Sequence, residues 1–156
     1  MKLATFEVGR HVYAGVVEGD AVLALDGDRT VADVLGGEQP GFGDRSWPLA
    51  EVKLHAPVPA PGSIYAIGLN YAKHVEETGQ TKPERPIVFV KVLGSVAPPS
   101  GPIRCPEVVR RLDYEGELTI VIGAAGKIGG YCVADDVSAR DLQGREPQWT
   151  RAKGAD

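Results

Sequence analysis

The sequence contains little cysteine and no long hydrophobic run. Its two cysteines, Cys105 and Cys132, form neither a CxxC pair nor a disulfide framework, so we expect small buried thiols in a reducing compartment. The longest apolar runs fall far short of the roughly 20 residues that cross a bilayer. The start, MKLATFEVGR, has no apolar segment behind a basic one. These absences predict a cytoplasmic protein without a membrane partner.

Charge of one sign is not concentrated anywhere along the chain. The 17 basic and 21 acidic residues are interspersed and give a formal net charge of −4. Because no basic stripe is present that would neutralise a phosphate backbone, nucleic acid is not an expected partner. With 43% hydrophobic and 24% charged residues, the chain has the composition of an ordinary globular protein that buries a core.

Short apolar runs separated by turn signals predict an α+β fold that is mostly β. The first part alternates such runs with EGD and DGD turns, which is typical of a small antiparallel meander. A brief helix is expected over 30–37, with Thr30 as its cap and Gly36 and Gly37 as its stop. The proline-rich HAPVPAPGS predicts an extended connector. We therefore expect a small β-rich domain over 1–56 and a second domain over 57–156.

The second domain is expected to contain further short strands and one helix. Strand-like runs occur in SIYAIG, RPIVFVKV and YCVADDVS, and a helix is predicted over 71–78, ending at Gly79. The glycine-rich GAAGKIGG lacks the G-x-G-x-x-G order and is followed by no amphipathic helix. We interpret it as a loop, not as a dinucleotide site.

The stretch DYEGELTIVIG, residues 113–123, places an acidic residue at every second position before an apolar run. In one extended strand Asp113, Glu115 and Glu117 would project to the same face. Two carboxylates about 5 Å apart repel by about 3 kcal/mol at an effective dielectric near 20. A solvated edge face would relieve that repulsion. Because the segment becomes predominantly apolar after Glu117, we expect a central buried strand, where a shared proton, an arginine or a divalent cation balances the charge.

More carboxylates follow the next apolar strand and favour the cation. Asp135, Asp136 and Asp141 lie in ADDVSARD. Oxygen ligands with no His or Cys nearby are typical of magnesium, manganese or calcium sites, and not of zinc or copper. An octahedral ion held by three carboxylates keeps positions for water and for a bidentate substrate, which is a catalytic type of site.

His74 and Glu77 stand three positions apart on the predicted helix. That spacing places both side chains on one face, where a carboxylate can orient an imidazole for acid–base catalysis. In isolation, a solvated helix face explains the pair more simply.

These blocks together resemble the fumarylacetoacetate hydrolase (FAH) family. They are IGLNYAKHVEETG, PIVFVK, DYEGEL and VADDVSARDLQ…QW…AKGAD, in the family's order and approximate spacing from Ile64 to the last residue. The first module resembles, less specifically, the small N-terminal domain of bacterial members. The resemblance implies a mixed β-roll catalytic domain, a homodimer, and a bound magnesium or manganese ion, with calcium as a possibility.

The resemblance also implies roles for individual residues. Glu115, Glu117 and Asp136 match the metal ligands, which makes Asp113 a neighbour and not a ligand. His74 and Glu77 match the pair that activates water, and Lys153 matches a catalytic lysine that contacts the substrate. Gln143 matches a glutamine in the same substrate pocket. The remaining matched positions are substrate contacts or structural supports: Tyr71, Lys91, Arg140 and Asp141.

The implied activity is hydrolysis of a carbon–carbon bond in a 1,3-diketone or acylpyruvate-type 2-oxo acid, through a metal-stabilised enolate. Alternatives are an oxaloacetate decarboxylase or 2-hydroxyhepta-2,4-diene-1,7-dioate isomerase, which need no attacking water, and an inactive metal-binding fragment. Family members continue beyond the AKGAD stretch with strands that complete the roll, whereas this sequence ends at Asp156. We therefore expect a partial catalytic domain whose last apolar strands lack partners.

Overall fold

Residues 1–154 are described by the computed structural model, so Ala155 and Asp156 of the AKGAD block lie outside the described residues. The chain forms two units. The first comprises Met1–Ala60, Val96–Ile103 and Gly116–Asp135. The second comprises Pro61–Ser95, Arg104–Glu115 and the described residues from Asp136 onward.

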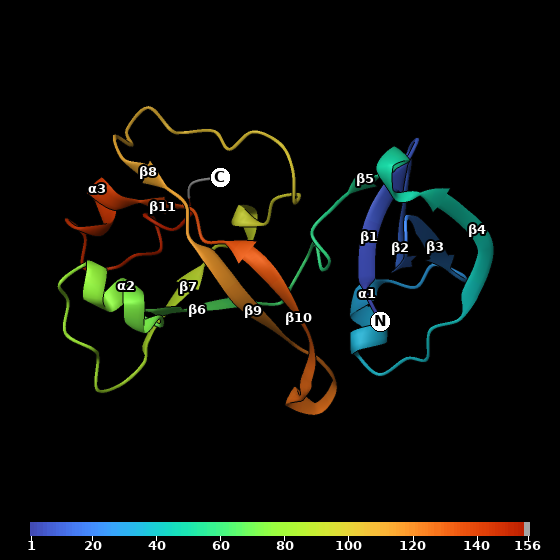
Figure 1. The fold of residues 1–156 in the computed structure, drawn as a ribbon, viewed down its shortest axis with the longest axis horizontal. Helices are drawn as coiled ribbons and strands as arrows, with labels where there is room; N and C mark the ends of the chain where they lie inside the picture. The colour runs from blue at the N-terminus through green and yellow to red at the C-terminus, as the bar shows by residue number, and fades with distance from the viewer. Residues whose placement is uncertain (155–156) are drawn as a thin grey trace. The chain divides into compact units, whose positions relative to one another are not determined.

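Five strands of the first unit form an antiparallel sheet in the order β4-β3-β2-β1-β5 (Figure 1). They are β1 Leu3–Val8, β2 His11–Glu18, β3 Ala21–Leu25, β4 Phe42–Pro48 and β5 Lys53–Leu54. The sheet confirms the predicted meander. Strand β4 was not predicted, because its Gly- and Pro-rich surroundings masked a run that pairs with β3 from Ala21 to Leu25. A short 3₁₀ turn, Leu49–Glu51, follows β4.

Phe6 on β1 is the centre of one face of this sheet. It is fully buried, as is Val22, and its ring centroid lies 5.7 Å from those of Tyr13 and Trp47. Gly15 on β2 is required by this packing, because a Cβ there would come within 2.8 Å of the Phe6 ring. The aromatic cluster therefore ties three strands together in a small unit.

The helix α1, Val31–Leu35, confirms the predicted cap and stop. The Thr30 side chain accepts a hydrogen bond from the Asp33 backbone N–H at 3.2 Å, and the Asp33 carboxylate accepts one from the Thr30 N–H at 2.8 Å. This reciprocal arrangement satisfies two N–H groups that the first turn leaves free. Gly36 forms the C-cap.

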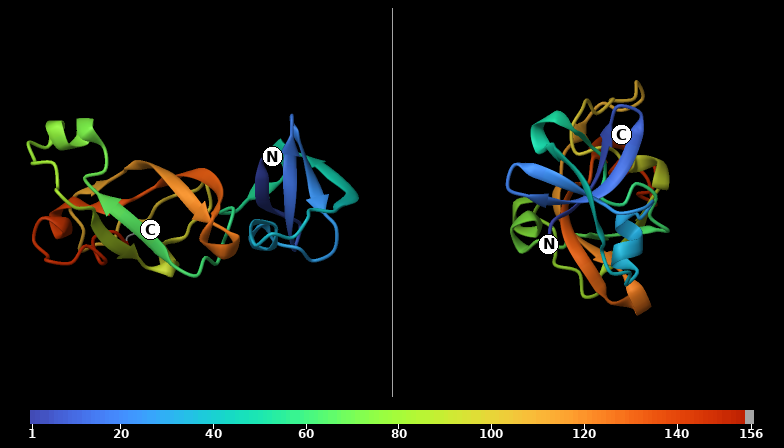
Figure 2. Two further views of the ribbon diagram at one scale, coloured as in Figure 1. Left: turned by 90° about the horizontal axis from the view of Figure 1, so that it is seen from below. Right: turned by 90° about the vertical axis from the view of Figure 1, so that its right-hand side faces the viewer.

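Strands β9, Gly116–Ile122, and β10, Ile128–Asp135, form an antiparallel hairpin that includes a 3₁₀ turn at Ala124–Gly126 (Figure 2). Three cross-strand pairs share one face, and their side chains are 49–83% exposed: Val133 with Leu118, Tyr131 with Ile120, and Ile128 with Ile122. The prediction of a central buried strand after Glu117 is therefore wrong for residues 1–154, in which this hairpin is a two-stranded sheet.

The second unit contains two small antiparallel sheets and two short helices. The sheets are β6 Ile64–Gly68 with β7 Ile87–Lys91, and β8 Leu112–Asp113 with β11 Ser138–Ala139. The helices are α2 Ala72–Glu77 and α3 Arg140–Gln143, with a 3₁₀ turn at Leu93–Ser95. Helix α2 confirms the helix predicted over 71–78.

A small cluster of buried residues packs α3 against β11 and the chain that follows it. Its members are Val109, Ala139, Leu142 and Ala152, with Leu112 at its margin. The backbone N–H of Ala139 donates to the Ala152 carbonyl at 2.7 Å, which fixes the last described segment beside β11. This contact brings Lys153 next to the start of α3.

Two further expectations concern exposure. No helix within residues 1–154 is long and apolar enough to cross a membrane. The expectation of two buried thiols is wrong: Cys105 is exposed and Cys132 is only partly buried. Cys105 lies in the irregular segment before β8, where little chain packs over it, and Cys132 lies on the two-stranded hairpin.

The carboxylate of Asp141 in α3 anchors the segment that precedes β8. It accepts hydrogen bonds from the backbone N–H groups of Arg110 and Arg111, at 3.3 and 3.2 Å. Burial raises the pKa of this carboxyl. The hydrogen bonds and the nearby Arg145 together lower the pKa by more than burial raises it, so it lies below the ordinary 3.8. Asp141 therefore supports the fold and joins two segments of the second unit.

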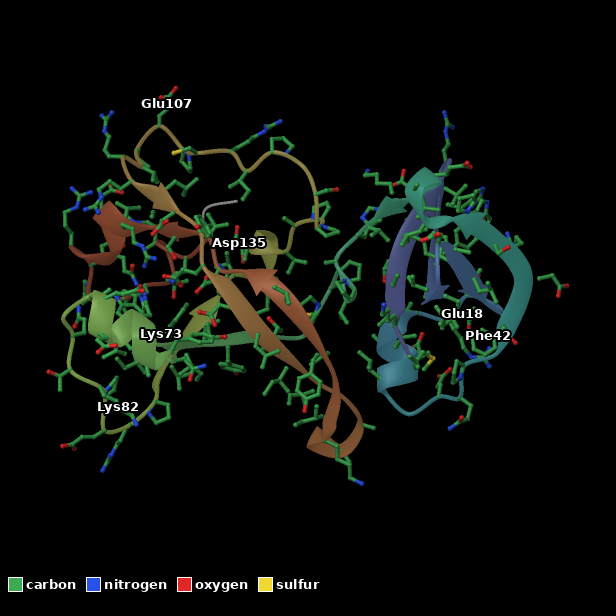
Figure 3. All side chains as sticks on the ribbon, in the orientation of Figure 1. Glu18, Phe42, Lys73, Lys82, Glu107 and Asp135 are labelled. Carbon is green, nitrogen blue, oxygen red and sulfur yellow. The ribbon has the colours of Figure 1, made fainter. Side chains whose placement is uncertain are left out.

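Phe6→Ala is expected to destabilise the chain by about 3–5 kcal/mol, because the cavity left beneath Trp47 cannot collapse. The matched control is Phe42→Ala, since Phe42, which is labelled in Figure 3, is 51% exposed. Its expected cost is about 1 kcal/mol or less. Urea unfolding followed by circular dichroism measures both, and equal losses would contradict the central position of Phe6.

Asp141→Asn is expected to be less stable than the unchanged chain above about pH 4. A carboxyl with a lowered folded pKa stabilises the fold above its unfolded pKa, ordinarily 3.8, and this benefit disappears as the pH falls through the folded pKa. The difference in unfolding free energy between the two proteins should therefore shrink below about pH 4. Urea titrations at several pH values measure it, and a pH-independent difference would refute the role of the charge.

Candidate active site

The acidic stretch is divided between two strands. Strand β8 ends at Asp113 and β9 begins at Gly116, so the predicted single strand that projects three carboxylates to one face is wrong. The reason is a change of pairing partner: Asp113 pairs with Ser138, whereas Gly116 pairs with Asp135. Glu115 lies between the two strands. Its side chain therefore does not follow the alternation of faces along a single strand.

Two carboxylates of the second unit meet at the ammonium group of Lys153. Its Nζ lies 2.6 Å from Oε2 of Glu115 and 2.9 Å from Oδ2 of Asp136. The side chains are 2% exposed for Lys153, 9% for Asp136 and 15% for Glu115. A charge this deeply buried is tolerated only when opposite charges and hydrogen bonds compensate its lost hydration.

Backbone contacts hold these two carboxylates in place. The N–H of Asp136 donates to the Glu115 carbonyl at 2.8 Å, and the Ser138 hydroxyl donates to the Asp136 carbonyl at 2.8 Å. Figure 3 labels Asp135, which ends β10 directly before this turn. The sequence ADDVS therefore places Asp136 beside Glu115 through main-chain hydrogen bonds.

Two more cations bind the outer oxygens of the same carboxylates. Lys91 Nζ lies 2.6 Å from Oδ1 of Asp136, and Arg140 Nη1 lies 2.5 Å from Oε1 of Glu115. Arg140 also donates from Nε to Asp113 at 2.9 Å. Every carboxylate oxygen of Glu115 and Asp136 thus has a cationic neighbour, and three cations face three carboxylates.

These contacts shift the ionisation of the outer pair. The hydrogen bond from Arg140 holds the pKa of Asp113 below its ordinary value, against an opposing effect of burial. Burial lowers the pKa of Arg140, but Asp113 and Glu115 raise it more, so the net direction is upward. Both groups are therefore charged across the physiological range.

Aromatic rings form one wall beside the Lys153 ammonium. Its Nζ lies 5.4 Å from the ring centroid of Phe89, which packs edge-on against Trp149 at 5.5 Å. Gly68 lies close to Trp149, since a Cβ there would come within 2.6 Å of the indole. This wall limits water near the ammonium and strengthens its interaction with the carboxylates.

The donor set fits a hard divalent cation at two of the three predicted ligands. The carboxylates of Glu115 and Asp136 converge on one cationic position, and oxygen donors suit magnesium, manganese or calcium. Glu117 lies on β9 in the first unit, partly buried and opposite Ala134. Within residues 1–154 no three His, Cys, Asp or Glu side chains are grouped closely enough to hold an ion. The three-ligand set therefore stays a prediction.

The other predicted residues lie on the two helices of the second unit, except Tyr71, which directly precedes α2 as its N-cap. His74 is partly buried on α2, whereas Tyr71 and Glu77 are exposed, and no hydrogen bond joins His74 to Glu77 among the described residues. Gln143 on α3 accepts from Arg140 at 3.0 Å. Gln143 thus joins the carboxylate cluster through Arg140, and the roles of His74 and Glu77 stay predictions.

Sequence reasoning did not foresee the aromatic wall or the ion pair between Lys91 and Asp136. Phe89 and Trp149 lie within blocks that carried the family resemblance, but nothing in their spacing indicated that they would meet. Lys91 and Asp136 are 45 positions apart, so only the fold brings them together. The sequence did indicate that Phe89 and Lys91 share one face of β7, since they stand two positions apart on a strand.

Two family models match almost the whole chain. Residues 63–156 match the fumarylacetoacetate (FAA) hydrolase C-terminal model, and residues 1–57 match the Rv2993c-like, N-terminal model. Protein Rv2993c of Mycobacterium tuberculosis is 45% identical, over 75% of this chain and 48% of its own length. The oxaloacetate tautomerase YisK of Bacillus subtilis is 37% identical, over 90% of this chain and 51% of its own length.

A solved structure supports the same assignment. The 5-carboxymethyl-2-hydroxymuconate delta-isomerase of Mycobacterium smegmatis superposes with a TM-score of 0.81 at 36% identity, covering 100% of this chain and 62% of that one. The chain spans about half the length of the curated relatives that it matches. Relatives are named as tautomerases, isomerases and hydrolases, so the family does not specify one reaction.

The small N-terminal β domain, the predominance of short strands and the two matching models agree with the expected fold class. This chain belongs to the fumarylacetoacetate hydrolase family, with an Rv2993c-like N-terminal domain followed by part of the FAA hydrolase domain.

Proposed function

We propose that the second unit carries the cation-binding part of an enzyme that acts on small 2-oxo acids through an enolate. The observation that carries this proposal is the convergence of Glu115 and Asp136 on one cationic position, the Nζ of Lys153. Two buried carboxylates held this close are costly for folding unless a cation compensates them. Their pairing around one buried ammonium is consistent with a role beyond stability.

Glu115, Glu117 and Asp136 would hold the divalent ion, magnesium or manganese, with calcium as a possibility. When bound, such an ion supplies electrostatic stabilisation for negative charge on adjacent oxygens of a 2-oxo acid or 1,3-diketone. Members of the family typically depend on a divalent metal. The aspect of the proposal specific to this chain is the set of ligands.

The chain's other residues orient this site and bind substrate. Lys91 and Arg140 contact the outer oxygens of Asp136 and Glu115, which fixes the orientation of both carboxylates. Lys153 and Gln143 would bind the oxygens of the substrate, because an ammonium and an amide donate hydrogen bonds to carboxylate and carbonyl groups. The rings of Phe89 and Trp149 exclude water from the ammonium.

The first candidate reaction is hydrolysis of a carbon–carbon bond in an acylpyruvate or other 1,3-diketone. His74 would take a proton from water at an imidazole nitrogen, and Glu77 would orient the ring. The two residues lie three positions apart on α2, within reach of one another after a side-chain rotation. Long contacts in a substrate-free site do not exclude such a pair.

The second candidate is proton transfer on an oxaloacetate-type substrate, as tautomerisation, isomerisation or decarboxylation. The relative named as an oxaloacetate tautomerase matches 90% of this chain at 37% identity, which favours this candidate. These reactions share the enolate but need no attacking water, so they do not require His74 and Glu77 to act together.

The wider setting is also part of the proposal. We propose a cytoplasmic homodimer with a small-molecule substrate and no nucleic-acid or membrane partner, in keeping with the net charge of −4. We keep residues 57–156 as the proposed catalytic domain. This range is close to residues 63–156, which match the FAA hydrolase model.

Glu115→Gln and Asp136→Asn are each expected to weaken binding of Mn²⁺ by about 100-fold or more, since each removes an anionic ligand. Glu76→Gln is the control, because Glu76 is an exposed glutamate on α2 of the same unit. Isothermal titration calorimetry measures the affinity. Wild-type affinity in either ligand variant would refute the assigned site.

His74→Asn separates the two reaction classes. Hydrolysis of an acylpyruvate is expected to fall by about 100-fold or more without the general base, whereas enolisation of oxaloacetate should change by less than about tenfold. Spectrophotometric assays of both substrates with Mg²⁺ present measure the rates. Unchanged acylpyruvate hydrolysis would exclude His74 as the base, and oxaloacetate turnover alone would establish the second candidate.

A further inference from the structure

Lys153 holds the place at which the two carboxylates meet. Its ammonium contacts the inner oxygens, Oε2 of Glu115 and Oδ2 of Asp136, while the outer oxygens face Arg140 and Lys91. The inner oxygens are therefore the ones that point toward a shared position. A divalent ion bound by both residues would compete with the ammonium for the same two atoms.

The Lys153 ammonium and a divalent ion differ in charge but have the same electrostatic effect on this site. Each neutralises a pair of carboxylates that would otherwise repel one another at close range. An ammonium and a divalent ion cannot share the inner oxygens at hydrogen-bond distance, because their own repulsion in this largely buried place is strong. One of them must leave when the other binds.

We propose that Lys153 is a built-in counter-ion that closes the metal-free site and is released when a divalent cation binds. The lysine holds Glu115 and Asp136 together in the absence of the ion. Release then presents its ammonium, which the pair had occupied, to an anionic substrate group such as a carboxylate. The inference rests on the proposed function, since it takes Glu115 and Asp136 as ligands, and it adds an order of events: ion first, substrate second.

Lys91 and Arg140 have a different role in this exchange. They contact the outer oxygens, 2.6 Å from Asp136 for Lys91 and 2.5 Å from Glu115 for Arg140, and an ion at the inner oxygens leaves these contacts intact. They act as positioning residues that keep the carboxylates aimed inward during the exchange. The structure thus offers a lysine that should move and a neighbouring lysine that should not.

Amine labelling of the purified chain tests the proposal directly. Lys153 is 2% exposed and paired, so a pulse of acetylating reagent should modify it slowly without metal. With saturating Mn²⁺ its modification rate, read by peptide mass spectrometry, should rise by about tenfold or more. Lys91 should keep its slow rate, and Lys53, an exposed lysine paired with Glu7 in the first unit, should react equally fast in both conditions.

A second measurement uses affinity in place of labelling. Lys153→Met should bind Mn²⁺ about tenfold more tightly than the unchanged chain, because no ammonium has to be displaced. Lys53→Met is the matched control and should bind as the unchanged chain does. Isothermal titration calorimetry gives the dissociation constants, and circular dichroism checks that each variant folds. The labelling result on the unchanged chain decides the question if Lys153→Met does not fold.

The outcomes are distinguishable. Binding of Mn²⁺ that leaves Lys153 protected, or that accelerates Lys91 and Lys153 alike, overturns the exchange while the proposed function stands. Equal or weaker binding by folded Lys153→Met overturns it as well. Absence of Mn²⁺ binding at Glu115 and Asp136 in the unchanged chain contradicts the proposed function, and the exchange falls with it.

Discussion

The contact on which the site depends is the one between the buried Lys153 ammonium and two carboxylates, one buried and one partly buried. Glu115 and Asp136 approach the same nitrogen within 2.6 and 2.9 Å, in a place that water hardly reaches. Removing the ammonium or one of the carboxylates would leave an uncompensated charge in this place, which typically costs about 3–5 kcal/mol. This charge arrangement is weak evidence for a contribution to stability, because burying the charges costs about as much as their attraction returns.

Much of the N-terminal sheet could be predicted because its turns and its helix cap depend on residues that are close together in the sequence. Turns at Gly9 and Gly19 require the positive φ of 64° and 57° that glycine adopts easily, and Thr30 with Asp33 satisfies the first turn of α1 by itself. Strand β4 escaped prediction because pairing with β3, and not its own composition, makes it extended. When pairing with a neighbouring strand makes a segment extended, the segment's own sequence contains few strand signals.

The acidic stretch shows where pattern reasoning failed. Alternation of Asp113, Glu115 and Glu117 predicted one strand, yet the chain changes partner at Glu115, from β11 to β10. The apolar run that follows is exposed on the hairpin, with Leu118 at 62% and Val133 at 83%. Periodicity reports which residues share a face only while one strand continues, and it says nothing about which face further polypeptide covers. The family resemblance, not the alternation, assigned Glu115, Glu117 and Asp136 together as expected metal ligands.

The relatives place this chain in a family whose members are named for several reactions of related substrates. The site that we propose is compatible with that breadth, because stabilising an enolate is one task that hydrolysis, tautomerisation and isomerisation can share. The most direct test of the account is anomalous diffraction from crystals soaked with Mn²⁺ and oxalate. The account predicts one strong peak contacted by carboxylate oxygens of Glu115 and Asp136, with oxalate on its open side. A peak remote from both residues, or none at saturating Mn²⁺, would contradict it.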